Sequence, residues 1–163
     1  MRIPVFAVLA ALVIPLAACG GGGAGASAAG KLGVELSTPD GWVVSDDGLV
    51  VARRSADLAV SVPSGPRVRV VPSADTNTDI NELIGDGEDA SNTTVVDIPE
   101  RTTVAGRQAL AITLRETDGN AQIVRRYVAA ASPTGASVLF VLEAPADTFE
   151  ASRAQLNRIP GWS

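Results

Sequence analysis

The stretch QALAITLRETDGNAQIVRRYVAAASPTGASVLFVLEA, from Gln108 to Ala144, decides the fold. Two turn signals divide it, Asp118-Gly119-Asn120 and Ser132-Pro133-Thr134-Gly135. Glycine, asparagine and proline favour turns because they adopt or fix the backbone angles that turns require. We therefore predict three strands that run back and forth as a β-meander, at residues 108–117, 121–131 and 136–144.

The alternation of side chains places these strands in a sheet, because successive residues of a strand point to opposite faces. In the first predicted strand one face carries Gln108, Leu110, Ile112 and Leu114, and the other carries Thr113 and Arg115. The third strand, which contains Val138, Phe140 and Leu142, is apolar on both faces. Such a strand is typical of the centre of a sheet.

Shorter elements are predicted before and after the meander. Turn residues separate strands expected at 33–37, from Trp42, at 49–54 and at 67–71, with 58–62 as a further candidate. A helix is expected from Ile80 to about Gly85. A closing helix follows Pro145, with Asp147 as its cap and Glu150 in a capping box. This pattern predicts an α+β domain, in which an antiparallel β-sheet is sandwiched by helices.

The first 18 residues have the parts of an export signal. Their apolar stretch, from Val5 to Ala18, is shorter than the roughly 20 residues that a transmembrane helix needs. Leu16-Ala17-Ala18-Cys19 matches the lipobox of bacterial lipoproteins, in which the cysteine thiol accepts diacylglycerol before cleavage. We expect residues 1–18 to be a lipoprotein signal peptide. The alternative is an ordinary secretory signal with Cys19 as a bystander.

Lipid on Cys19 would hold the mature chain on the extracytoplasmic face of the cell membrane. Two acyl chains, such as palmitate, anchor a protein firmly, whereas a single chain attaches reversibly. An unbroken run of Gly, Ala and one Ser follows from Gly20 to Gly30 and favours a flexible tether. We therefore expect a linker at 19–30 and one α/β domain at 31–163.

The composition restricts the partners. The 163 residues include 13 basic and 18 acidic side chains, for a formal charge of -5. Because phosphate binding needs a concentrated basic face, this balance argues against nucleic acid. Lys31 is the only lysine, and alanine, glycine and valine are abundant. This bias indicates a GC-rich genome, so we expect an actinobacterial source.

The chain has no histidine, and its single cysteine is Cys19. Ser-His-Asp and Cys-His catalysis and zinc sites of imidazole and thiolate are therefore excluded. Two acidic groups, Asp46 with Asp47 and Asp86 with Glu88 and Asp89, stand in turn-like contexts and are interpreted as solvated turn residues. We expect no catalytic residues and no cofactor.

The weak candidate for a metal site is Asp75-x-Asn77-x-Asp79, followed by Asp86. Alternating oxygen ligands of this kind begin and end a calcium loop. Ile80, however, stands where that loop needs glycine, and the final ligand is Asp rather than the longer Glu. We favour a polar loop that caps a helix over a calcium site.

Two arginine pairs and two tryptophans are the remaining candidates for recognition. A strand's period of two puts Arg67 and Arg69 on one face and sends Arg125 and Arg126 to opposite faces. Arginine side chains are suited to binding an acidic partner. We favour the interpretation that these arginines lie on a solvated face of the sheet and form ion pairs with acids of the same chain. Trp42 and Trp162 each follow a glycine, and we favour core or rim packing over recognition for both.

The order of elements resembles the PsbP-like fold. This fold is shared by the extrinsic PsbP protein of photosystem II, a nuclear-import factor that binds the GTPase Ran, and actinobacterial LpqN-type lipoproteins. The resemblance covers about residues 33–160. It lies in Pro39-Asp40-Gly41-Trp42 after an early strand, a middle helix, the hairpin at Asp118-Gly119 with Tyr127 on its return strand, a strand through Phe140, and a closing helix. It implies a binding or assembly protein.

Three functions remain open. The first is a non-catalytic, membrane-tethered domain that binds another envelope component, most plausibly a protein. The second is a carrier or sensor of a small apolar or lipidic ligand, which predicts a cavity of several hundred cubic ångströms. The third is a carboxylate-based glycan hydrolase, which requires two acids across a cleft at roughly 5 to 9.5 Å.

Overall fold

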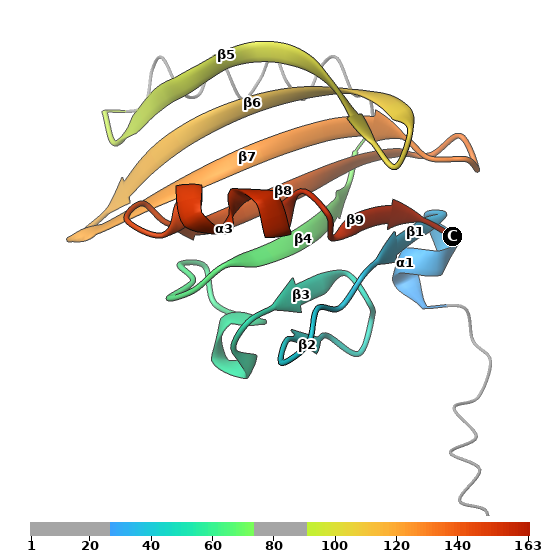
Figure 1. Cartoon of the computed structure of the whole chain (residues 1–163), viewed down its shortest axis with the longest axis horizontal. Helices are drawn as coiled ribbons and strands as arrows, with labels where there is room; N and C mark the ends of the chain where they lie inside the picture. The colour runs from blue at the N-terminus through green and yellow to red at the C-terminus, as the bar shows by residue number, and fades with distance from the viewer. Residues whose placement is uncertain (1–26, 74–90) are drawn as a thin grey trace, which may run out of the picture.

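The structure is a computed structural model that describes residues 27–73 and 91–163 (Figure 1). Its described elements are α1 (Ala28–Lys31), β1 (Val34–Leu36), β2 (Val43–Val44), β3 (Val50–Ala52), the 3₁₀ helix η1 (Ser55–Asp57), β4 (Arg67–Pro72), β5 (Thr93–Val104), β6 (Arg107–Asp118), β7 (Ala121–Ala131), β8 (Ser137–Pro145), α3 (Phe149–Leu156) and β9 (Pro160–Trp162). One sheet has the order β2-β3-β4-β8-β7-β6-β5, and a second pairs β1 with β9. All of these pairings are antiparallel.

The predicted β-meander is confirmed as β6, β7 and β8. Gly119 and Gly135 lie in its two turns with φ of 60° and 87°, which is left-handed backbone that favours glycine. β8 pairs with β4 on one side and β7 on the other, and all its residues except the first and last are buried. It is therefore the central strand that its sequence predicts.

The main hydrophobic core lies between one face of the large sheet and a layer made by α3, β1 and β9 (Figure 1). α3 buries Phe149 and Leu156, and Ile159 follows it into the core. Phe140 is the largest apolar side chain that the sheet contributes. The closing helix and its apolar residues are thus confirmed. We call this side of the sheet the helix face.

The other side of the sheet, called here the second face, carries a smaller apolar cluster. Its buried members are Ile112, Leu114, Ala129, Leu139 and Val141. Ala109 and Ala111 of β6 point instead into the main core. The predicted alternation along β6 is therefore confirmed.

Two strands were not predicted. β5 is a 12-residue edge strand whose pairing with β6 is interrupted by register shifts between Val95 and Glu100. Pro99 lies within it, and proline is tolerated in edge strands and bulges because its missing N–H leaves the inner ladder intact. β9 pairs with β1 from the far end of the chain.

The candidate strand at 58–62 is wrong. The chain there forms an irregular loop after η1, because carbonyl groups along this stretch accept hydrogen bonds from two arginine side chains. Arg67 donates to the carbonyl oxygens of Asp57 and Val60, and Arg125 donates to that of Ser61.

The cap of α3 differs from the prediction, and the short helix α1 was not predicted. α3 is capped at Thr148, not Asp147, and the Thr148 hydroxyl donates to the carbonyl of Pro145. The expected linker ends at Gly30, whereas α1 already begins at Ala28. Its start is fixed because Ser27 Oγ accepts from Gly30 N, and Ala29 N donates to Asp47 O.

Several predictions lie outside the described residues. They are the signal peptide, the lipobox Leu16-Ala17-Ala18 with Cys19, the calcium candidate Asp75, Asn77, Asp79 and Asp86, the acids Glu88 and Asp89, and the helix from Ile80 to Gly85. In the two described ranges, no helix is both long and apolar enough to cross a membrane.

Candidate functional site

A groove of about 630 Å³ lies at one end of the three long strands β5, β6 and β7. Its lining comes from one short segment of each strand, at residues 101–103, 108–110 and 129–131. The short side chains of Ala129 and Ala131 lie on the second face, so the sheet is hollowed there, whereas the Ala130 side chain packs in the main core. The volume lies within the range of pockets that bind small molecules or side chains, about 300–1,000 Å³.

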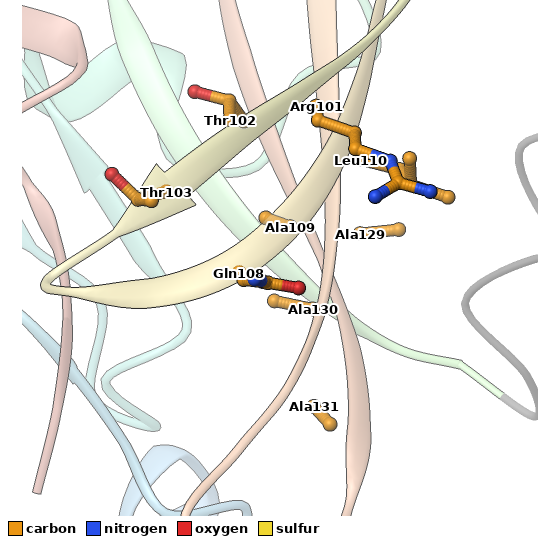
Figure 2. Close-up of a pocket in the computed structure, with 9 residues that line it drawn as sticks. All are labelled: Arg101, Thr102, Thr103, Gln108, Ala109, Leu110, Ala129, Ala130 and Ala131. Carbon is orange, nitrogen blue, oxygen red and sulfur yellow. The ribbon is translucent and has the colours of Figure 1, made fainter.

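The strand register explains how the groove is built. Arg101 pairs with Leu110, and Leu110 pairs with Ala129, so the three side chains form one row across the sheet. Figure 2 shows Arg101 and Leu110 extending to the same side as Ala129. This row lies on the second face, next to the buried cluster. The groove therefore offers a guanidinium above an apolar floor.

At the same end of the sheet, but on the helix face, Arg107 and Trp162 form a stacked pair. The Arg107 guanidinium lies 6.0 Å from the centre of the Trp162 ring, and its Nε donates to the carbonyl of Ala131. Trp162 packs edge-on against Phe140 and donates from Nε1 to Val104 O. Both tryptophans pack as expected, since Trp42 lies in the main core.

At the other end of the second face, charged side chains meet around one buried carboxylate. Glu143 of β8 is fully buried and accepts from Arg67 Nε at 2.6 Å, Arg69 Nε at 2.6 Å and Arg125 Nε at 2.8 Å. Arg125 also pairs with Glu116, which accepts from the Tyr127 hydroxyl. We call these six residues the arginine–glutamate cluster.

The predicted faces of the arginines are confirmed, but their expected solvation is not. Arg67, Arg69 and Arg125 share the second face, and Arg126 lies on the helix face with its guanidinium on Glu100 and Thr113. Arg67 is only 1% exposed. A charge can be buried in this way only when it is paired and hydrogen-bonded, so the cluster holds the fold together and leaves few free charges for a partner.

The surroundings change the pKa values within the cluster. Burial alone would raise the pKa of Glu143, but the hydrogen bond from Arg67 and the charge of Arg69 lower it overall, with a further hydrogen bond from Arg125. Burial and the neighbouring Glu116 raise the pKa of Tyr127. Glu143 is therefore an ionised structural residue, with no exposed surface through which to act on a substrate.

Of the two predicted acidic groups, the structure describes Asp46 with Asp47. Asp46 and Asp47 lie exposed in the turn between β2 and β3, and the pKa of Asp47 is lowered chiefly by a hydrogen bond from Ser45 and a second from Leu49 N. Within residues 27–73 and 91–163, no three acidic, histidine or cysteine side chains gather in a way that could hold a metal ion.

A second hollow of about 540 Å³ lies at the opposite end of the long strands. It is bounded by residues 62–64, by 120–123 after the β6–β7 turn, and by 145–147 before α3. Its side chains are prolines, amides, small and aliphatic residues and one carboxylate, Asp147, without an arginine or an aromatic ring. The first groove, which combines a cation with an apolar floor, is therefore the stronger candidate.

Comparison with known proteins finds similarity in structure alone. No family model matches the chain, and no curated protein matches its sequence. The solution structure of the cyanobacterial PsbP protein (CyanoP) of Synechocystis sp. PCC 6803 matches with a TM-score of 0.54 and 17% identity. That match covers 91% of this chain and 99% of CyanoP.

A second similar structure is LpqN of Mycobacterium tuberculosis, described as involved in cell envelope biogenesis. The match has a TM-score of 0.51 and 16% identity, and it covers 77% of this chain and 79% of LpqN. At this identity the likeness concerns the fold alone. The chain thus has the PsbP-like fold that its sequence resembles, in a form that is mostly antiparallel sheet across the described residues.

Proposed function

We propose that this chain is a non-catalytic binding or assembly module of the cell envelope. Lipid on Cys19 anchors it to the extracytoplasmic face of the membrane, and another envelope component, a protein, binds in the groove at the end of β5, β6 and β7. The fold of LpqN, a protein of cell envelope biogenesis, supports the envelope assignment. In this proposal the antiparallel sheet is sandwiched by helices, as the sequence predicts.

The groove is the observation that carries the proposal. Its floor of Ala129 and Leu110 is suited to an apolar side chain, and Arg101 is suited to an acidic group beside it. The arginine–glutamate cluster, by contrast, is already satisfied by its own hydrogen bonds. Binding therefore fits the groove, where polar and apolar groups face solvent together.

Site-specific crosslinking tests the proposal. A photoreactive amino acid at Gln108, which lines the groove, should capture an envelope protein in living cells. The matched control is Arg115, an exposed residue of β6 outside the groove. We expect a discrete adduct from position 108 and none from 115. Equal capture from both positions, or no adduct from 108, would contradict a binding groove.

The second candidate is a carrier or sensor of a small apolar or lipidic ligand. The groove volume and its alanine floor favour it, although the lining also includes Arg101 and Gln108 and the groove is open to solvent. The same crosslinking distinguishes the two functions. Mass spectrometry of a carrier would find lipid at position 108, whereas a protein adduct supports the assembly module.

A further inference from the structure

The outer edge of β5 runs along the groove. β5 is the last strand in the order of the large sheet, so among the described residues no strand pairs with its outer side. Residues 101–103 of β5 also line the groove. Figure 1 shows β5 as the outermost labelled strand of this sheet. A partner that enters the groove therefore also meets a strand edge.

The β5–β6 turn determines which backbone groups point outward from this edge. The turn residues 105–106 have φ of 43° and 82° and connect the paired residues Val104 and Arg107. In a two-residue hairpin of this kind the flanking pair is hydrogen-bonded, and hydrogen-bonded and non-hydrogen-bonded pairs alternate from there along the strands. The N–H and C=O groups of Arg101 and Thr103 therefore point away from β6.

The preceding part of the β5 edge is unsuited to pairing with another strand. Its register with β6 shifts twice between Val95 and Glu100, and Pro99 has no N–H to donate. Bulges and proline are features by which proteins prevent strands from adding to an edge. Both features end at Glu100, where the groove begins. The regular stretch 101–104, beside the groove, therefore remains suited to a partner strand.

The charges of β5 favour an acidic strand at this stretch. Arg101 is exposed, and its side chain extends on the second face. The two acids of β5 are engaged on the helix face, where Asp97 pairs with Arg153 and Glu100 pairs with Arg126. Opposite charges that face each other across two strands stabilise the pair, and like charges weaken it. A second copy of β5 would bring two Arg101 side chains close together, so a strand with an acid opposite Arg101 fits better.

We infer that the partner protein contributes an extended segment that adds to β5 at residues 101–103 as a further strand. An acidic residue of this segment lies opposite Arg101, and its backbone pairs with the outward N–H and C=O groups of Arg101 and Thr103. The inference rests on the proposed function, because it states how the same partner occupies the groove. Strand addition gives affinity through the main chain and specificity through neighbouring pockets, and the groove is the pocket beside this edge.

Proline substitution in the full lipidated chain tests the backbone contact. Thr103→Pro removes an outward N–H but no hydrogen bond to β6, and proline is tolerated at such edge positions. Thr93→Pro is the matched control at the other end of β5. Its N–H also points outward, because Asn92, the preceding residue, accepts from Thr117 N of β6.

The readout is the yield of the partner adduct in cells from a photoreactive amino acid at Gln108. We expect this yield to fall about tenfold in Thr103→Pro, as the loss of ~1.4 kcal/mol would give, and to remain unchanged in Thr93→Pro. Circular dichroism verifies that each variant is folded.

Charge reversal tests the acidic residue of the added strand. Arg101→Glu replaces an attractive cross-strand pair by a repulsive one, so the adduct yield should fall about fivefold. Arg115→Glu, at an exposed position of β6 outside the groove, is the control and should leave the yield unchanged. Equal yields from these two variants would contradict an acid opposite Arg101.

Hydrogen exchange on the purified adduct gives a readout that needs no variant. The amides of Arg101 and Thr103 point away from β6 and should exchange about tenfold more slowly in the adduct than in the free chain, for a bond of the same strength. The amides of Thr102 and Val104 already donate to β6, so their exchange should change less. Unchanged exchange at Arg101 and Thr103 would overturn the strand addition, even if Thr103→Pro does not fold.

The outcomes separate this inference from the function on which it rests. If the chain without further substitution gives no adduct at Gln108, both are overturned. Equal adduct yields in folded Thr103→Pro and Thr93→Pro overturn the strand addition alone, because the partner then binds in the groove without the edge. The inference is also wrong if the adduct consists of lipid or of a second copy of this chain, since neither is an acidic partner strand.

Discussion

Arg67 and Glu143 face each other on the adjacent strands β4 and β8, with Nε and Oε1 2.6 Å apart and both side chains buried. The pair is the centre of the arginine–glutamate cluster, which also fixes the loop after η1 through the carbonyl oxygens of Asp57 and Val60. A buried charge is tolerated only while its partner remains. The stability of the domain should therefore depend strongly on Glu143.

Glu143→Gln tests that dependence. The variant keeps the shape of the side chain but leaves Arg67 buried without a counter-charge, so we expect the free energy of unfolding to fall by about 3–5 kcal/mol. Urea unfolding followed by circular dichroism measures the change. Glu150→Gln is the control, because Glu150 is 75% exposed in its pair with Arg153 and should change stability by less than ~1 kcal/mol. Similar losses in both variants would refute the special role of Glu143.

The lowered pKa of Glu143 predicts how stability depends on pH. In the unfolded chain this carboxyl titrates near 4.5, and in the folded chain it titrates below that. The unfolded state therefore binds more protons in acid, and the contribution of Glu143 is present above pH 4.5 and is lost as pH falls through the folded pKa. Unfolding measured between pH 3 and pH 6 should show a shallower acid loss in Glu143→Gln. An identical slope in both proteins would contradict the shift.

Ala105 and Gly106 form the β5–β6 turn with φ of 43° and 82°. The first angle strains an alanine, whose Cβ is unfavourable in left-handed backbone by about 1–2 kcal/mol. Ala105→Gly should therefore raise the melting temperature, with a gain of about 1 kcal/mol. Ala151→Gly, within α3, should lower stability by about 1 kcal/mol, because glycine weakens helices. A loss of stability from both variants would mean that the turn is not strained.

The lipid anchor has its own prediction. Cys19→Ala removes the thiol that would accept diacylglycerol, so metabolic labelling with a radioactive fatty acid should disappear and the precursor should accumulate uncleaved. Cys19→Ser is a closer isostere and should behave in the same way. Labelling that persists in either variant would show that the lipid is attached elsewhere or that Cys19 is a bystander.

The meander was predictable from sequence because its three strands are long, regular and separated by glycine-containing turns. β5 was not, since Pro99 and the register shifts around it remove the alternation that marks a strand. β9 has only three residues and forms because β1, distant in sequence, is available as a partner.

For the candidate sites, too, the sequence predicts local features but not contacts between distant strands. The faces of Arg67, Arg69, Arg125 and Arg126 follow from the strand period, but their convergence depends on the strand order β4-β8-β7. The sequence around Glu143 contains a signal for buried ion pairs that our prediction did not use. A single acid in an otherwise apolar central strand needs a buried cation, and arginines stand at the register positions of both neighbours. The groove had no signal of its own, because it depends on the row of Arg101, Leu110 and Ala129 across three strands.

Filling the groove tests the central claim most directly. Ala131→Trp places an indole in the groove, whereas Ala154→Trp places one on the exposed surface of α3. Each lipoprotein is crosslinked in cells, solubilised in detergent and purified, and the co-purified envelope protein is quantified by mass spectrometry. We expect the yield to fall roughly tenfold for Ala131→Trp, as a loss of ~1.4 kcal/mol would give, and to remain unchanged for Ala154→Trp. Undiminished capture by a folded Ala131→Trp variant would contradict the proposed binding site.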